Sequence, residues 1–189
     1  TGVRRGAGGT ERGLDADQVW ASIPITALVR AMSPAAPEPV QAAARSVRTR
    51  GMILIYLILG QDQFTEYDAH YFPELAIPMS RMSGPKNYSA TTEPGGRTIL
   101  CAELPCDPGE EYWDMPDDEI GRRMCGWLAD VGLPVTAPVI RTETRRLGAA
   151  YPLFDLTSKD GFGVMEDWIG GNQGPLTLGW QGRVGPDTT

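Results

Sequence analysis

The sequence has few of the residues that usually carry catalysis or bind metals. It has one histidine, His70, and three cysteines without CxxC spacing, Cys101, Cys106 and Cys125, so no metal-ligand cluster is present. All but two of the 17 cationic residues are arginines, which leaves few candidates for a catalytic lysine. A nucleophile elbow and distinctively spaced carboxylate pairs are also missing. We therefore expect no metal site and no catalysis by side chains alone, and we interpret the cysteines as reduced thiols in a cytoplasmic protein.

An excess of basic charge is missing as well. The formal net charge is −7 and the sequence pI is about 4.7, which argues against nucleic-acid binding through a broad basic surface. The longest apolar run, Met52 to Leu59, is too short for a membrane-spanning helix. The first residue is Thr1 rather than Met, which indicates that the chain begins inside a longer reading frame or after processing.

A glycine-rich stretch near the start invites comparison with a dinucleotide-binding fingerprint. Gly6-Ala7-Gly8-Gly9 has Glu11 where the third glycine of GxGxxG should stand. No hydrophobic strand precedes the glycines and no apolar helix follows them, so the βαβ context is absent. We predict a hairpin turn here.

The remaining pattern predicts alternating short strands and helices. At 189 residues with 41% apolar content, the chain can form one substantial core. The acidic residues just before and at the start of the helix predicted at 116–131 are explained by the positive partial charge of a helix N-terminus rather than by a cation site. The run 51–60 is interpreted as the central strand of the sheet, buried on both faces. The predicted strands are 17–24, 51–60, 69–72, 78–83, 97–104, 139–147 and one from Leu176, and the predicted helices are 25–32, 40–47, 116–131 and 162–169.

Three places are candidates for binding. Arg81 lies between apolar residues in a predicted strand, where it either pairs with an anion in a pocket or is solvated at a sheet edge. Tyr151 and Pro152 end a strand, and the tyrosine ring either lines a cavity or packs in the core. The turn Gly182-Arg183-Val184-Gly185 follows the last strand and joins flexible backbone to a permanent cation, which suits an anion such as phosphate as well as an ordinary surface turn.

Together these segments resemble the C-terminal half of the flavin-dependent amine-oxidase superfamily, especially its branch similar to protoporphyrinogen oxidase and UDP-galactopyranose mutase. Residues 16–25 look like the segment that enters the substrate domain, with Pro24 near the flavin. Residues 146–152 resemble a sequence segment that lies beside the isoalloxazine ring in this family. The turn from Gly182 to Gly185 resembles the turn at which the family's chain returns to the FAD domain. The residues that usually follow this turn are replaced by Pro-Asp-Thr-Thr, and the GxGxxG front of the family is absent from this sequence.

The resemblance implies an α+β fold with a mixed, mostly antiparallel sheet and helices packed on one face. It implies an FAD-domain remnant at 1–32, a substrate-binding domain at 33–175 and the start of the return to the FAD domain at 176–189. Arg81, Tyr151 and Pro152 would then contact substrate, and Pro24, Gly182, Arg183 and Gly185 would contact FAD.

The implied function is the substrate-binding portion of an FAD-dependent oxidoreductase whose flavin accepts a hydride from a small organic substrate. We expect the isolated fragment to be inactive without an N-terminal FAD-binding segment and not to retain FAD. Two alternatives stay open: a flavin-free binding or assembly module, and a mutase-like enzyme acting on a sugar nucleotide. A homo-oligomer formed through exposed surface is compatible with each.

Overall fold

The computed structural model describes residues 2–7, 10–91, 93–153, 158–171 and 176–177 of the chain. It divides into two compact units. We call Thr1–Thr49 with Tyr151–Thr189 the terminal unit and Arg50–Ala150 the sheet unit. The predicted boundaries at 32/33 and 175/176 concern a division between cofactor and substrate parts, and they stay a prediction.

The terminal unit begins with a hairpin. Strands β1 (Gly2–Ala7) and β2 (Thr10–Asp15) pair in antiparallel register, with Ala7 opposite Thr10. The hairpin predicted from the glycine-rich stretch is therefore confirmed, and this stretch does not open a βαβ unit. Two further short strands, β3 (Trp20–Ala21) and β9 (Leu176–Thr177), pair in parallel although they lie at opposite ends of the chain.

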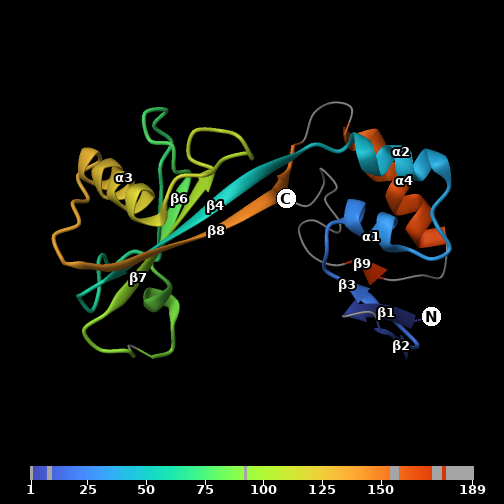
Figure 1. Ribbon diagram of the computed structural model, residues 1–189, viewed down its shortest axis with the longest axis horizontal. Coiled ribbons are helices and arrows are strands. Elements are labelled where there is room, and N and C mark those ends of the chain that lie inside the picture. The colour runs from blue at the N-terminus through green and yellow to red at the C-terminus, as the bar shows by residue number, and fades with distance from the viewer. Residues whose placement is uncertain (1, 8–9, 92, 154–157, 172–175, 178–189) are drawn as a thin grey trace. The chain divides into compact units, whose positions relative to one another are not determined.

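Three helices form the core of the terminal unit (Figure 1). They are α1 (Ile25–Ala31), α2 (Glu38–Ser46) and α4 (Ser158–Gly171), each close to its predicted position. Their apolar residues recur at helical spacing, so each helix buries one stripe against the others. The buried cluster is Ala21, Ile25, Leu28, Val29, Ala36, Val40, Ala44, Phe162, Met165 and Ile169.

The sheet unit is built on a five-stranded sheet in the order β5-β6-β7-β4-β8. The strands are β4 (Thr49–Leu59), β5 (Ala69–Tyr71), β6 (Arg81–Ser83), β7 (Thr98–Pro105) and β8 (Val139–Pro152). The pairs β5–β6, β6–β7 and β4–β7 are antiparallel, in agreement with the mostly antiparallel sheet that the resemblance implied. Together with the helices, this sheet confirms the predicted α+β class.

The prediction for β4 was wrong in two respects. The middle strand of the five is β7, and β4 is the interior strand beside it. Ile53, Ile55, Leu57 and Leu59 are buried, but the alternating residues on the other side of β4 are only half-buried. An apolar run of this kind shows that a strand lies inside a sheet, but both its position and the cover on each face depend on distant residues.

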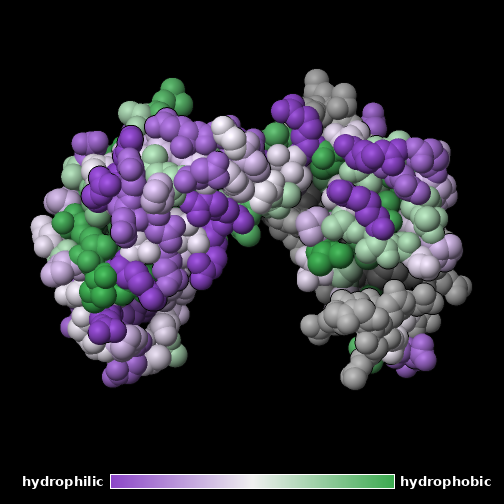
Figure 2. Space-filling view, in the orientation of Figure 1, coloured by the Kyte–Doolittle hydropathy of each residue, from purple (hydrophilic) through white to green (hydrophobic). Residues whose placement is uncertain are grey.

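One helix covers one face of this sheet. Helix α3 (Asp117–Asp130) follows Pro116 and buries Ile120, Met124 and Leu128 against β4 and β7. It ends at Gly132, which has a φ of 78°, and the Leu133 N–H donates to the Leu128 carbonyl at 2.8 Å. We call the opposite side of the sheet the outer face. In Figure 2, hydrophilic residues predominate over β4 and β8 on the visible surface of this unit.

An ion-pair cluster joins the start of β4 to the segment after β7. Arg50 donates from Nη1 to Glu110 Oε1 at 2.7 Å and from Nη2 to Oε2 at 2.8 Å, and it also contacts Asp107 Oδ2 at 2.5 Å. The Asp107 N–H donates to Glu110 Oε2 at 2.9 Å. The hydrogen bonds from Arg50 and from this N–H lower the pKa of Glu110 from 4.5 to about 2.

This shift predicts a dependence of stability on acid pH. Because the pKa is lower in the folded chain, the stabilisation is complete above the ordinary value of 4.5 and is lost as pH falls through about 2. We expect Glu110→Gln to flatten the decline in unfolding free energy between these pH values, measured by denaturant titrations along a pH series. Glu111→Gln is the control, because it changes the net charge equally and removes only a 3.9 Å contact to Arg123. Equal flattening by both variants would contradict the assignment.

Candidate functional site

The outer face is built by the alternation of side chains along the strands. On β8, Thr142 and Thr144 are buried on the side of α3, where Thr144 Oγ1 donates to Asp117 Oδ1 at 2.6 Å. Arg141, Glu143 and Arg145 therefore lie on the outer face. On β4 and β7 the same alternation places Leu54, Tyr56, Ile58, Ile99, Cys101 and Glu103 there.

Arg81 lies on the outer face and is held by a carboxylate. It stands opposite Glu103 in the β6–β7 register, and its Nε donates to Glu103 Oε1 at 3.1 Å, with Nη2 on the same oxygen. The hydrogen bond that Arg81 donates to Glu103 is the main cause that raises the pKa of Arg81. The Arg81 side chain is 39% exposed and that of Glu103 is 15% exposed. The sequence did not predict that Arg81 pairs with Glu103. The Arg81 side chain nevertheless remains partly accessible to solvent.

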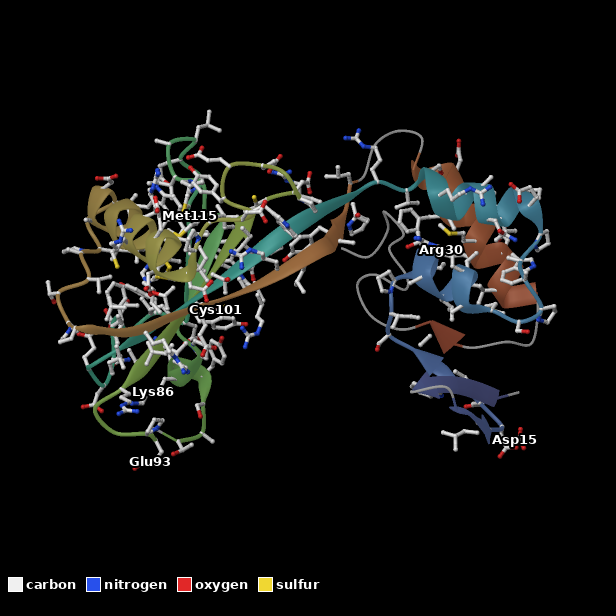
Figure 3. All side chains as sticks on the ribbon, viewed as in Figure 1. Asp15, Arg30, Lys86, Glu93, Cys101 and Met115 are labelled. Atoms are coloured by element: carbon white, nitrogen blue, oxygen red, sulfur yellow. The ribbon has the colours of Figure 1, made fainter. Side chains whose placement is uncertain are left out.

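A phenol and a thiol meet beside this ion pair. Tyr56 stands opposite Cys101 in the β4–β7 register, and their side chains are hydrogen-bonded. Burial raises the pKa of both groups, so both keep their protons at neutral pH. The charge of Arg145, which lies on the neighbouring strand β8, acts on the pKa of Tyr56 in the opposite direction. Cys101 is labelled among the strands in Figure 3.

The charged residues of β8 form a stripe with one carboxylate between two guanidinium groups. Arg141 Nη2 lies 2.7 Å from Glu143 Oε1, and Arg145 Nη2 lies 3.5 Å from Glu143 Oε2. The arginine side chains are 66% and 65% exposed, respectively. These residues, with Tyr56 and Cys101, were missed by the sequence reasoning. Their signals are the i, i+2 spacing of charges on β8 and the single phenol within the apolar run of β4.

The predicted residues of the terminal unit lie at the ends of its elements. The Pro24 carbonyl accepts from the Ala27 and Leu28 N–H groups at 2.8 and 3.0 Å and so starts α1. Tyr151 and Pro152 are the last two residues of β8, and Tyr151 is 41% exposed. The predicted turn residues Gly182, Arg183 and Gly185 lie outside the described residues.

The structure brings two of the predicted segments together. The strand that precedes Pro24, β3, pairs in parallel with β9, the strand that precedes the predicted Gly-Arg-Val-Gly turn. Trp20 is opposite Leu176, and Ala21 is opposite Thr177. The two crossing segments that the sequence resemblance assigned to a cofactor domain are therefore neighbours in one sheet.

Two further features of the described residues concern metal ions and membranes. Within these ranges, His, Cys, Asp and Glu side chains form no group of three or more that could hold a metal ion. Among the helices of the described ranges, none has the length and apolar character needed to cross a membrane.

Comparisons with known proteins identify the fold. No protein-family model matches the sequence, and a search of curated proteins finds no match. Among solved structures, reduced UDP-galactopyranose mutase superposes with a TM-score of 0.67 at 14% identity, over 87% of this chain and 36% of that one. A protein assigned as a protoporphyrinogen oxidase from Exiguobacterium sp. 255-15 gives 0.60 at 14% identity, over 95% and 39%. A putrescine oxidase triple mutant with redesigned cofactor binding gives 0.51 at 13%, over 80% and 34%.

The chain thus has the fold of one part of these enzymes. It spans 34–39% of the length of the three solved chains. At these identities the likeness concerns the fold, and it confirms at that level the family resemblance found in the sequence. The three names, a mutase and two oxidases, coincide with the branches to which the sequence was similar.

Proposed function

We propose that this chain is the substrate-binding portion of an FAD-dependent oxidoreductase of the amine-oxidase kind. The observation that carries the proposal is the parallel pairing of β3 with β9, because it joins the two segments expected to lead to and from a cofactor domain. The fold shared with a mutase and two oxidases supports the same conclusion. The three free cysteines suit a reducing compartment, so the proposal includes a cytoplasmic location.

The described residues fit a chain that supplies only part of a cofactor site. The glycine-rich stretch near the start forms an antiparallel hairpin rather than the turn of a βαβ unit, so this stretch is not a dinucleotide cradle. In the proposal an N-terminal FAD-binding segment holds most of the cofactor. Pro24, Gly182, Arg183 and Gly185 add contacts from this chain.

Flavin and protein have different roles in the proposal. When bound, the flavin supplies the chemistry, which is the acceptance of a hydride from substrate. This chain's residues then bind and orient the substrate. Arg81, whose side chain is 39% exposed, and Tyr151 with Pro152 are the proposed substrate contacts. Tyr56 and Cys101 are uncharged at neutral pH and line the outer face without adding charge.

The proposed cofactor contact of Arg183 gives a direct test in the protein encoded by the complete reading frame. We expect Arg183→Ala to weaken flavin retention about 10-fold or more, since a hydrogen bond to a charged group contributes roughly 1.5–3 kcal/mol. The measurement is bound flavin per chain after dialysis against a series of free FAD concentrations. Arg97→Ala, which removes an exposed arginine of the sheet unit, is the control and should retain flavin fully. Unchanged retention in Arg183→Ala would overturn the contact.

The 189-residue chain alone provides the complementary test of the proposal. We propose that it neither retains FAD nor turns over substrate until an N-terminal segment is added. A stoichiometric flavin on the purified chain, or full activity without a second polypeptide, would contradict this. A stable monomer that never recovers flavin when the complete reading frame is expressed would favour the flavin-free binding module instead.

Rearrangement without net oxidation is the second candidate, because UDP-galactopyranose mutase gives a TM-score of 0.67. Anaerobic mixing with substrate separates the two activities. If the chain belongs to an oxidoreductase, the protein with oxidised flavin should bleach in proportion to substrate. If it belongs to a mutase, the protein with chemically reduced flavin should convert substrate and remain reduced at the end.

A further inference from the structure

The outer face has an apolar strip, which we define as Leu54, Tyr56 and Ile58 of β4. These side chains are half-buried, and they alternate with core residues that are fully buried beneath α3. Ile99 of the neighbouring strand stands opposite Ile58 and is 41% exposed. The strip is therefore a partly exposed apolar surface within the sheet unit, which can contact the nonpolar part of a ligand.

Five charged residues of β6, β7 and β8 share the outer face with this strip, and their charges do not balance. The ion pairs of the outer face join three arginines, Arg81, Arg141 and Arg145, to two glutamates, Glu103 and Glu143. These five residues together carry one excess positive charge, in a chain whose net charge is −7. A local positive excess on an acidic protein attracts anions and repels cations.

The three arginines differ in how well their charge is compensated. Arg81 directs two nitrogens to Glu103, a largely buried carboxylate. On β8 the single carboxylate of Glu143 is shared, and it lies closer to Arg141, at 2.7 Å, than to Arg145, at 3.5 Å. Arg145 Nη1 donates to the Thr144 carbonyl at 2.9 Å, which fixes the guanidinium in place. Arg145 is thus the least compensated of the three arginines. It lies on β8, the neighbour of β4 in the sheet, and its charge acts on Tyr56 of the apolar strip.

We propose that the outer face binds an anion with an apolar body, with Arg145 as the anchor of the anionic group and the apolar strip as the surface for the body. A carboxylate and a phosphate monoester fit this chemistry alike, and an alkylammonium ion does not. The inference names a substrate class for the proposed function. That the bound anion is a substrate rests on the proposed function, but the binding itself does not. The binding step needs no flavin, so it is measured on the chain itself.

The test uses ligands that share one alkyl chain and differ in charge. Decanoate, decyl phosphate and decyltrimethylammonium are titrated into the 189-residue chain below their micelle concentrations, with binding followed by calorimetry. We expect one or both anions to bind, the affinity to fall as ionic strength rises, and the cation to bind at least 10-fold more weakly. The anion that binds more tightly distinguishes a carboxylate from a phosphate. Equal affinity for the cation would overturn the proposal.

Arg145→Ala and Arg141→Ala form a matched pair. Each removes one arginine of about 65% exposure and one contact with Glu143, and of the two it is Arg145 whose charge acts on Tyr56 of the strip. We expect Arg145→Ala to weaken anion binding at least 10-fold, and Arg141→Ala to weaken it less than about 3-fold. Equal losses in Arg145→Ala and Arg141→Ala would show a diffuse charge effect and overturn the anchor. Circular dichroism checks that each variant is folded.

The outcome is separable from that of the proposed function. If the complete protein retains flavin and the anions do not bind, only the ligand class is wrong. If the anions bind through Arg145 and no flavin is ever retained, the proposed oxidoreductase fails and the anion site stands.

Discussion

Replacing Gly121 with alanine is expected to destabilise the sheet unit by about 1–3 kcal/mol, the usual cost of inserting a group into a packed core. A Cβ at Gly121 would lie 2.2 Å from Thr142 Oγ1, 2.9 Å from its Cγ2 and 3.0 Å from its Cβ. Rotation of the threonine side chain cannot relieve the contact, because the Thr142 Cβ is itself too close. Helix α3 or strand β8 must therefore move.

The control for this prediction lies on the same helix. Gly126 has no heavy atom within 4 Å of a built Cβ, so Gly126→Ala should stabilise α3 by up to about 1 kcal/mol through helix propensity alone. Denaturant midpoints, followed by circular dichroism, measure both variants. Gly121→Ala combined with Thr142→Ala should regain part of the loss, since two of the three close atoms are then removed. Equal stability of Gly121→Ala and Gly126→Ala would contradict the close packing of α3 on β8.

Local signals explain why the sequence predicted the elements well. Pro116 and Gly132 bound α3, and the proline after β3 starts α1, because these residues restrict or permit backbone geometry without help from distant parts of the chain. The apolar spacing of α4 likewise predicts which side is buried. The order β5-β6-β7-β4-β8 depends instead on pairing between segments far apart, so the sequence placed β4 one position too centrally.

The candidate site was predicted less completely, for a related reason. Arg81 was identified from its position in a strand, but its partner Glu103 is 22 residues away and is set by strand register. A shift of one residue would have turned Glu103 to the other face. The pairing of Tyr56 with Cys101 and the proximity of Arg145 have the same origin. Register therefore decides which side chains share the outer face, and composition does not reveal it.

Truncating Leu57 should cost about 2–5 kcal/mol of unfolding free energy, the range for removing a large aliphatic side chain from a core. Leu57 has no exposed surface, stands opposite Leu100 and belongs to the cluster that joins the sheet to α3. Ile58 is the next residue on the same strand but points to the outer face and is only half-buried, so Ile58→Ala should cost clearly less. Thermal and denaturant unfolding of the two variants measures the difference.

This comparison also tests the surface on which the ligand inference depends. If Ile58 belongs to an accessible strip, Ile58→Ala should leave the chain folded while weakening decanoate or decyl phosphate binding, because apolar contact with the alkyl body is lost. Leu57→Ala should have the opposite balance, a large loss of stability with unchanged affinity in the fraction that remains folded. A larger stability loss in Ile58→Ala than in Leu57→Ala would mean that the two faces of β4 are reversed, and the apolar strip would then be core rather than binding surface.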